Sequence, residues 1–298
     1  MVKIYGFGNA LIDIEISLSE QKLLSLGIAK GSMVHISAEQ KNTWLKRFSR
    51  EIVSTQPGGS IANAIYAASS QKSYCTFSCT LGNDKEKDLF LNGFDNDLIN
   101  IFHQNSYKQT GVCFIFVTPD GERTMASHLS ANEDLVPGCI DKNFLSKSDW
   151  LIFDAFSVCT KNGFKTAKYA LNIAKENKLK VGFGLADINL VKSNKSELLW
   201  VLSQSIDLIA GNENEISLLK DYISINTNVL CSLGSKGCRF NSIHAKVNSN
   251  VNIVNTNGAG DALLGIFLSY IDNLTTEKAL RKAVDYATQV CQIGGPRI

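Results

Sequence analysis

Residues 255–261, with the sequence NTNGAGD, combine a glycine-rich turn with a carboxylate, and this combination suits phosphate chemistry. An apolar, strand-like run from Val251 precedes the turn and an apolar helical segment over 262–270 follows it, so the sequence predicts a strand-to-helix junction. The unpaired amides of a first helical turn point outward, and glycines let an anionic group approach the backbone closely. A phosphate is therefore the expected ligand of this turn.

Asp261 is the residue of the turn that could take part in chemistry. Beside a bound phosphate, a carboxylate can take the proton from an attacking hydroxyl, which is the help that phosphoryl transfer needs most. A carboxylate in the first helical turn also stabilises the helix as a charge, and this plainer role accounts for an arbitrary Gly-x-Gly-Asp. The sequence holds neither a Gly-x-x-x-x-Gly-Lys-Ser/Thr loop nor a suitably placed dinucleotide Gly-x-Gly-x-x-Gly.

A second glycine turn and a polar N-terminal segment could hold the acceptor molecule. Gly58 and Gly59 open a predicted helix, with Asn63 one turn inside it. Taken alone, a turn with a helix cap explains this segment equally well. Asn9 and Asp13 lie at an otherwise apolar strand exit. Buried polar side chains need hydrogen-bond partners, and the hydroxyls of a sugar would serve.

The elements that would position these residues are those of a parallel sheet covered by helices. Short β-rich runs alternate with amphipathic helical segments along most of the chain. The predicted strands are 3–7, 74–80, 150–153, 180–183, 208–210 and 229–232, and the predicted helices are 38–48, 60–70, 84–94, 162–177, 213–221, 259–272 and 277–291.

Two regions break this alternation and predict a separate small sheet. Segments 11–16 and 32–36, like segments 111–117 and 123–128, have the character of consecutive strands without long helices between them. The second pair is joined by Pro119-Asp120-Gly121, a strong turn signal. A small sheet made from both regions, lying over the main sheet as a lid, explains why they are distant in sequence yet alike.

Composition narrows the classes of partner. The 298 residues are 44% hydrophobic, which is enough for a full core. Their net charge of +2 is too balanced for a nucleic-acid or membrane-surface footprint. The eight cysteines show no paired C-x-x-C spacing, so we expect reduced core residues. No apolar run approaches the length of a bilayer span and no secretory pattern opens the chain, so the cytoplasm is the expected compartment.

The three motifs together, in this order and spacing, resemble the ribokinase family of carbohydrate kinases, also called the phosphofructokinase B family. Residues 255–261 look like the family's Asp-Thr-x-Gly-Ala-Gly-Asp, and Gly58-Gly59 with Asn63 looks like its N-terminal signature. Within the family the sequence is most similar to adenosine kinases and their bacterial relatives. That closer likeness rests on Gly8-Asn9 followed by Asp13, on 120–125 (DGERTM) and on 212–215 (NENE).

The resemblance spans nearly the whole chain and implies its architecture. We expect an α/β fold of the ribokinase-like kind, a three-layer sandwich with a mostly parallel central sheet and a small β-sheet lid. The whole chain, 1–298, would be a single domain, with the lid formed by segments of about 10–36 and 106–129 inserted in it.

The resemblance also implies a role for each residue that matches a family motif. Asp261 would be the general base on the acceptor hydroxyl, and Arg123, on the lid, would move toward the phosphates on closure and supply positive charge. The amides around Gly258, Ala259 and Gly260 would form an anion hole for the transferring phosphoryl group. The residues that would hold the ribose are Asn9, Asp13, Gly58, Gly59 and Asn63.

ATP and Mg²⁺ are the cofactors that the resemblance implies. Asn212 and Glu215 occupy the family's Asn-x-x-Glu positions, which organise Mg²⁺ through water, in keeping with magnesium's reluctance to lose its hydration shell. The nucleotide side would also include Ser232, Gly234, Gly237 and Asn257. Plainer roles compete, because Asn212 could cap the helix that it precedes and 234–237 could be a hairpin turn.

Two residues raise questions that the resemblance leaves open. The family's first signature residue is Asp, and here it is Asn255. If the family Asp orients the turn by hydrogen bonds, Asn255 can substitute, and if it helps to place the metal electrostatically, turnover should fall. His35 lies in the predicted lid strand, where adenosine kinases present side chains to the base, although a lone strand histidine is more often a surface or structural residue.

These observations lead to three functional hypotheses. The first is an ATP-dependent nucleoside kinase of adenosine-kinase type, transferring the γ-phosphoryl group to a ribose 5′-hydroxyl. The second is a sugar kinase acting on a ribose- or fructose-like substrate. The third, supported by Asn255, is a nucleoside-binding sensor with weakened catalysis. The expected partner is a small-molecule nucleoside or sugar, with no nucleic acid and no membrane, and both a monomer and a homodimer remain open.

Overall fold

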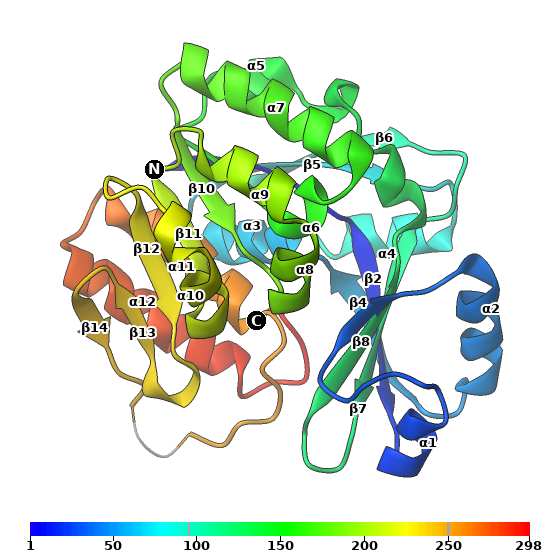
Figure 1. The fold of residues 1–298 in the computed structure, drawn as a ribbon. Coiled ribbons are helices and arrows are strands. Elements are labelled where there is room, and N and C mark those ends of the chain that lie inside the picture. The colour runs from blue at the N-terminus through cyan, green and yellow to red at the C-terminus, as the bar shows by residue number, and fades with distance from the viewer. Residues whose placement is uncertain (95, 249–250) are drawn as a thin grey trace.

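The computed structural model describes residues 1–94, 96–248 and 251–298, and in these ranges it shows two β-sheets with helices around the larger one (Figure 1). The larger sheet has, within the described ranges, nine strands in the order β14-β13-β12-β11-β10-β9-β1-β5-β6. Neighbouring strands from β12 to β6 are parallel, and β13 and β14 add antiparallel at one edge. These strands are β1 (Lys3–Phe7), β5 (Tyr74–Leu81), β6 (Ile99–Asn105), β9 (Trp150–Asp154), β10 (Lys180–Gly184), β11 (Leu208–Asn212), β12 (Asn228–Ser232), β13 (Cys238–Phe240) and β14 (Ile243–Ala245).

Helices cover both faces of this sheet, and the alternation along each strand decides which cluster a side chain joins. In β1, Ile4 joins the cluster on one face, while Tyr5 and Phe7 join the cluster on the other. The first face is covered by α3 (Ser60–Ser70), α4 (Lys85–Asn92), α11 (Ala259–Ile271) and α12 (Thr276–Val290). The second is covered by α5 (Lys142–Leu145), α6 (Ala155–Val158), α7 (Lys161–Glu176), α8 (Ile188–Ser193), α9 (Lys195–Leu202) and α10 (Glu213–Leu219).

The smaller sheet forms a lid beside the carboxyl ends of the parallel strands. Its order is β3-β8-β7-β2-β4, with the strands β2 (Leu11–Ser17), β3 (Met33–His35), β4 (Ile52–Gly58), β7 (Gly111–Val117) and β8 (Arg123–His128). The helices α1 (Glu20–Leu24) and α2 (Ala38–Arg47) lie on its outer side (Figure 1). Trp44 of α2 packs edge-on against Phe114 and Phe116, with ring centroids 5.6 and 5.4 Å away. The lid core belongs to the same hydrophobic cluster as the first face of the main sheet.

The fold class expected from the sequence is confirmed, and three details of the prediction are corrected. The lid has an additional strand, β4, whose Gly58 ends it rather than lying in a simple turn. The strand β6 was also missed, at an edge of the main sheet. The expected strand before the glycine-rich turn is wrong, because residues 251–258 form a loop without strand pairing.

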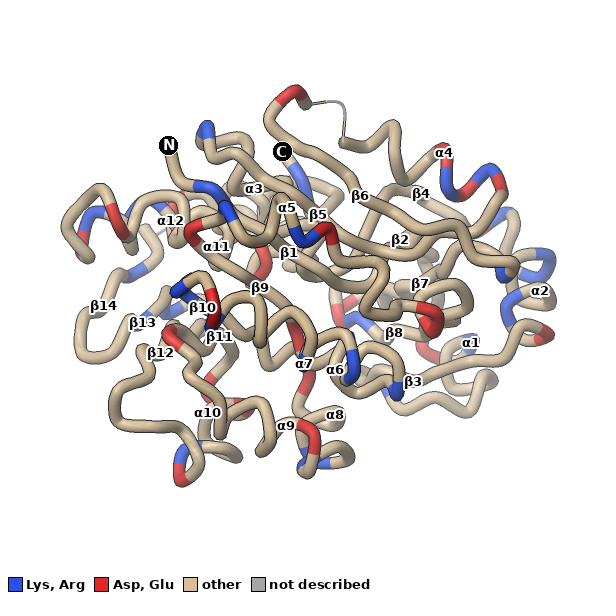
Figure 2. The backbone as a smooth tube through the Cα atoms, turned by 90° about the horizontal axis from the view of Figure 1, so that it is seen from above, with Lys and Arg blue, Asp and Glu red and all other residues tan. Residues whose placement is uncertain are grey.

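In Figure 2, basic and acidic segments are interspersed along the chain. Within the described ranges, no helix combines the length and the apolar character that a membrane span requires.

Candidate active site

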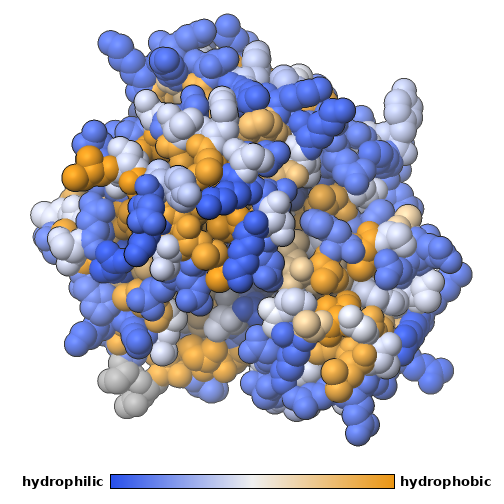
Figure 3. Space-filling view, in the orientation of Figure 1, coloured by the Kyte–Doolittle hydropathy of each residue, from blue (hydrophilic) through white to orange (hydrophobic). Residues whose placement is uncertain are grey.

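A cavity of about 400 Å³ lies between the lid and the carboxyl ends of the parallel strands. In Figure 3 the surface is hollowed between the main body and the lid. Ligands of open α/β sheets bind at this edge, because the strand ends and the loops that follow them converge there. The residues predicted from the sequence that line the cavity are Asn9, Asp13, Gly59, Asn63, Arg123, Asn212, Glu215, Ser232, Asn257, Gly258, Gly260 and Asp261.

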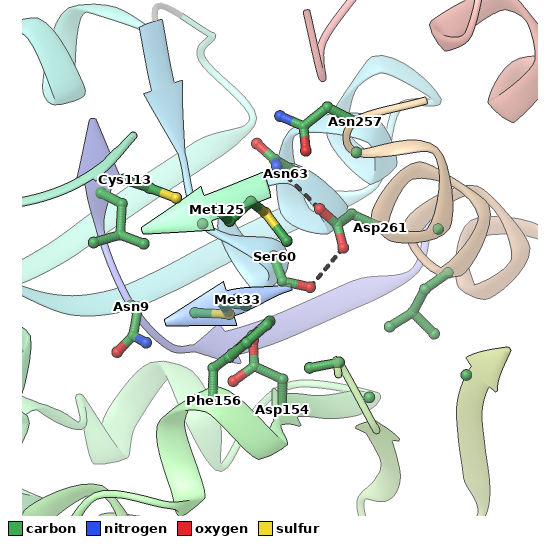
Figure 4. Close-up of a pocket in the computed structure, with 18 of the residues that line it drawn as sticks. Asn9, Met33, Ser60, Asn63, Cys113, Met125, Asp154, Phe156, Asn257 and Asp261 are labelled. Atoms are coloured by element: carbon green, nitrogen blue, oxygen red, sulfur yellow. Dashed lines mark hydrogen bonds between the residues drawn. The ribbon is translucent and has the colours of Figure 1, made fainter. Parts of the chain in front are cut away.

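Asp261 is held by two side chains of α3 in the first turn of α11. Ser60 Oγ donates a hydrogen bond to Asp261 Oδ1 at 2.5 Å, and Asn63 Nδ2 donates to Oδ2 at 3.0 Å. Figure 4 shows the carboxylate directed toward both partners. Burial raises the pKa of Asp261 above its ordinary value, against the lowering effect of the two hydrogen bonds and of Arg297 and Arg123. An oriented carboxylate of raised pKa is a stronger base than an exposed one.

The turn before Asp261 leaves amides open to the cavity. Gly258 caps α11 in the left-handed conformation, with φ of 74°. The Ala262 amide already donates to Gly258 O at 2.8 Å, whereas no acceptor among the described residues meets the amides of Gly260 and Asp261. A Cβ added at Gly260 would meet open space. An anionic group could therefore approach these two amides.

Asn9 and Gly59 meet at the floor of the cavity. The Asn9 side chain is 5% exposed, and its Oδ1 is buried with no hydrogen-bond partner in the described part of the chain. A buried acceptor without a donor costs free energy, so a ligand hydroxyl would find a partner there. Gly59 has φ of 104°, and a Cβ at this position would overlap the carbonyl oxygen of Asn9. Glycine is therefore required where α3 begins beside Asn9.

Asp13 brings a buried carboxyl group from the lid strand β2 to the same cavity. Its side chain is 6% exposed, and Asn257 Nδ2 donates to its Oδ2 at 3.3 Å. Burial raises the pKa of Asp13 to about 7, although Asn257 and Arg297 lower it. Gly58 lies directly beneath this carboxyl group, and a Cβ at Gly58 would overlap it. Gly58 does not line the cavity itself and instead leaves room for Asp13.

Replacing Asp13 by asparagine should stabilise the protein more at pH 8 than at pH 4. The folded-state pKa of Asp13, about 7, exceeds the ordinary value of 3.8, so the folded state retains a proton that the unfolded state releases between these values. Wild-type stability therefore falls as the pH rises through this window, and Asp13→Asn avoids the loss. We expect a gain in unfolding free energy on the order of 4 kcal/mol at pH 8.

Denaturant unfolding of both proteins at pH 4 and pH 8 measures this difference. The exposed Asp221 serves as the matched control, because Asp221→Asn should change stability little at either pH. An equal effect of Asp13→Asn at both pH values would contradict the buried, protonated state of Asp13.

The lid meets the loop before α11 through a hydrogen-bonded cluster. Arg123 Nη1 donates to Asn255 Oδ1 at 3.0 Å, and Arg123 Nη2 donates to Thr256 Oγ1. Asn255 Nδ2 donates in turn to Glu15 Oε2 at 3.0 Å, and Asn255 Oδ1 also accepts from the Asn257 amide at 2.8 Å. Asn255 therefore connects two lid strands to the glycine-rich turn. The NH₂ group of Asn255 faces the Glu15 carboxylate as a hydrogen-bond donor. An aspartate at 255 would place a second carboxylate there, which can only accept and would repel the first.

One wall of the cavity is apolar and comes largely from the lid strands. Met33 of β3 pairs in register with Met125 of β8, and both line the cavity with Cys113 and Ile115 of β7. Phe156 of α6 lines it from the main body. Figure 4 shows Met33, Cys113 and Met125 together with Phe156 around the same space. A flat apolar group would be accepted between them.

Asn212 and Glu215 lie where β11 passes into α10. They form a reciprocal capping box, in which Asn212 Oδ1 accepts from the Glu215 amide at 2.9 Å and Glu215 Oε2 accepts from the Asn212 amide at 2.9 Å. The capping alternative is thus what the geometry shows, and Glu215 still lines the cavity while being 5% exposed. No cluster of three or more His, Cys, Asp or Glu in the described ranges could hold a metal directly. A carboxylate acting through water fits this arrangement.

The remaining predicted residues do not line the cavity. Gly234 and Gly237 lie in the connection between the antiparallel strands β12 and β13, which agrees with the alternative of a hairpin turn. Of the residues 232–237 predicted for the nucleotide side, Ser232 lines the cavity and these two glycines do not. Ala259 opens α11 without lining the space. His35 is exposed at the end of β3 and does not line the cavity, whereas Met33 of the same strand does.

The structure adds residues that sequence reasoning missed. Ser60 follows the glycine pair directly, so its place beside Asn63 on one helical turn could have been noticed. Asp154 ends β9, caps α6 through the Ser157 amide at 2.9 Å, and has its pKa raised to about 6 by burial. Glu15 and Arg297 carry no local signal, because their partners lie 240 and 234 residues away along the chain.

Comparisons with known proteins give a family and two similar folds. The sequence matches the pfkB family carbohydrate kinase family over residues 22–298. A ribokinase from Dictyostelium discoideum is 25% identical over 274 residues, covering 80% of this chain and 84% of that protein. Among solved structures, an adenosine kinase from Sinorhizobium meliloti superposes with a TM-score of 0.91 at 22% identity, over 100% of this chain and 96% of that one. A probable sugar kinase protein from Rhizobium etli CFN 42 also reaches 0.91, at 21% identity over 99% and 94%. At these identities the two structures share the fold with this chain.

Proposed function

This chain belongs to the pfkB family of carbohydrate kinases, and on that premise we propose that it transfers the γ-phosphoryl group of ATP to the ribose 5′-hydroxyl of a nucleoside. Family members are phosphotransferases that act on hydroxyl groups of sugars or nucleosides, so what the proposal adds is the identity of the acceptor molecule. The observation that supports a nucleoside is the apolar wall of Met33, Ile115 and Met125 facing the cavity that also contains Asn9 and Asp13. The polar residues suit a ribose, and the apolar wall suits a base.

In the proposed reaction Asp261 acts as general base. The acceptor oxygen attacks the γ-phosphorus as its proton passes to the Asp261 carboxylate, and the bond from the γ-phosphorus to the bridging oxygen of ADP breaks. Ser60 and Asn63 each occupy one carboxylate oxygen of Asp261, so they fix its plane and leave further lone pairs for the acceptor. Asn9 Oδ1 would accept a hydrogen bond from a ribose hydroxyl.

Negative charge on the phosphoryl group would be stabilised from two sides. The amides of Gly260 and Asp261 would donate to its oxygens from the start of α11. Arg123 already lies at the glycine-rich turn, through Asn255 and Thr256, and would exchange these partners for phosphate oxygens. Bound Mg²⁺ would neutralise the phosphates, with Glu215 and Asn212 holding its water ligands.

A sugar kinase is the second candidate, and the ribokinase relative favours it. Phosphorylation of adenosine, inosine, guanosine, ribose and fructose with ATP separates the two, and we expect the highest kcat/KM for a nucleoside. Preference for a free sugar over every nucleoside would exclude the nucleoside assignment.

The variant Met125→Ser sharpens this test, because it removes apolar contact from the wall and leaves the ribose side intact. We expect kcat/KM for the nucleoside to fall by about 10-fold, and that for ribose to change by no more than about 2-fold. Val53→Ser is the control, since Val53 is a 62% exposed residue of the lid strand β4 outside the cavity. Equal losses for nucleoside and ribose in Met125→Ser would contradict a base on this wall.

A further inference from the structure

The segment that follows α12 returns to the active site. In Figure 1 the C label lies near the middle of the molecule, away from the last turn of α12. A Cβ added at Gly258 would overlap Pro296, and one added at Gly295 would overlap the side chain of Gln56. The segment 294–297 thus packs against the glycine-rich turn on one side and the lid strand β4 on the other.

Arg297 is anchored within this segment by two hydrogen bonds and two aromatic rings. Its Nε donates to Asn63 Oδ1 at 3.0 Å, and its Nη1 donates to Gly93 O at 3.2 Å. The guanidinium carbon lies 4.2 Å from the ring centroid of Phe94 and 5.1 Å from that of Tyr66. A planar guanidinium stacked and bonded in this way has little freedom to turn.

The bond from Arg297 decides which way the Asn63 amide faces. A guanidinium can only donate hydrogen bonds, so the oxygen of the Asn63 amide must face Arg297 and its NH₂ group must face the other way. That NH₂ group donates to Asp261 Oδ2 at 3.0 Å. In the flipped orientation the Asn63 oxygen would face the Asp261 carboxylate, and two acceptors would oppose each other. Arg297 itself does not line the cavity.

We infer that Arg297 is a positioning residue for phosphoryl transfer, holding the Asn63 amide in the orientation that donates to Asp261. This role rests on the proposed function of Asp261 as general base. It differs from substrate binding because Arg297 acts through Asn63, from outside the cavity. The acceptor that is turned over fastest serves for its test, so the identity of the acceptor does not affect the result.

The charges around Asp261 add a second readout. Asp13 from β2 and Asp154 from the end of β9 are the carboxyl groups that interact with it, and Arg123 from β8 and Arg297 are the cations. Removal of the Arg297 charge leaves Arg123 as the cation of this set and raises the pKa of Asp261 further. Asp261 must be ionised to accept a proton, so kcat falls at low pH as Asp261 becomes protonated. This acid limb of the pH profile of kcat should move to higher pH in a variant without the Arg297 charge.

The decisive variant is Arg297→Met, which keeps an unbranched apolar stem beside Phe94 but removes the guanidinium with its donors and its charge. We expect kcat to fall by about 10-fold with the acceptor KM within about 2-fold, and the acid limb to rise by about half a pH unit. Arg297→Lys, which retains a cation and one donor, should recover the position of the limb and most of kcat. Arg47→Met is the matched control, because Arg47 also lies over a ring, 5.0 Å from the Phe48 centroid, on the lid helix α2.

A double variant tests whether Arg297 acts through Asn63. If it does, the pH-independent kcat of Asn63→Ala/Arg297→Met, measured above the acid limb, should equal that of Asn63→Ala alone. Multiplied losses in the double variant, or an unshifted acid limb in Arg297→Met, would overturn the positioning role. Wild-type kinetics of Arg297→Met beside an inactive Asp261→Asn would overturn this role only, whereas a fully active Asp261→Asn would overturn the proposed base. If Arg297→Met does not fold, Arg297→Lys takes its place in the test. A large loss of kcat together with a shifted acid limb in Arg297→Lys would likewise overturn the role.

Discussion

Asp261→Asn should lower kcat by about 10³-fold and leave the fold intact, because a positioned general base contributes on the order of 10²–10⁴ to the rate. Asparagine has the shape of aspartate, and both neighbours can still be satisfied. Its oxygen can accept from Asn63 Nδ2, and its NH₂ group can donate to Ser60 Oγ. The loss should therefore appear in kcat rather than in stability or acceptor binding.

Steady-state kinetics and calorimetric binding of the nucleoside measure the two effects separately. Glu277→Gln is the matched control, because Glu277 is a carboxylate in the first turn of α12 and tests the helix-charge role without the chemistry. Full activity of Asp261→Asn would remove the base from the proposed mechanism. A wild-type protein that binds nucleoside but shows no turnover with excess Mg²⁺ would favour the sensor hypothesis.

Asn255→Asp should impair the enzyme, although it restores the residue of the family signature. The Asn255 amide donates to Glu15 Oε2 at 3.0 Å, so an aspartate would place two carboxylates together in a half-buried cluster. Their repulsion would displace the turn that carries the open amides and Arg123's partners, and a displacement of about 1 Å can cost on the order of 10²-fold in rate. We expect a loss of kcat/KM of that size.

The double variant Glu15→Gln/Asn255→Asp should recover kcat/KM to within about 5-fold of wild type, because the glutamine amide can donate to the new carboxylate. Glu51→Gln is the control on the lid. Glu51 forms an ion pair with Lys22, with Oε1 2.6 Å from Nζ, and it does not line the cavity. Activity of Asn255→Asp equal to or above wild type would show that Glu15 does not set the requirement at 255.

Sequence reasoning predicted the fold and the residues that belong to motifs, because glycine turns and polar residues at strand exits are local features. It missed β4, whose sequence Ile52–Gly58 mixes polar residues with Pro57 and resembles an edge strand only once its neighbour β2 is known. It assigned a strand before the glycine-rich turn from apolar residues that find no pairing partner.

The side chains that were missed depend on contacts across the chain. Arg297 reaches Asn63 from the segment after α12, and no spacing within the sequence indicates this approach. Met33 and His35 flank Val34 on a three-residue strand and share one face of it, so the alternation of side chains does not distinguish them. Only the placement of β3 against β8 decides that Met33 reaches the cavity and His35 does not.

The bond between Glu15 and Asn255 also has an evolutionary consequence. If either carboxylate-amide arrangement works and the carboxylate pair does not, positions 15 and 255 cannot drift independently. A lineage that moves from asparagine to aspartate at 255 would lose less activity by changing position 15 first. Among close relatives, asparagine at 255 should therefore occur together with glutamate at 15, and the two residues should be inherited as one unit.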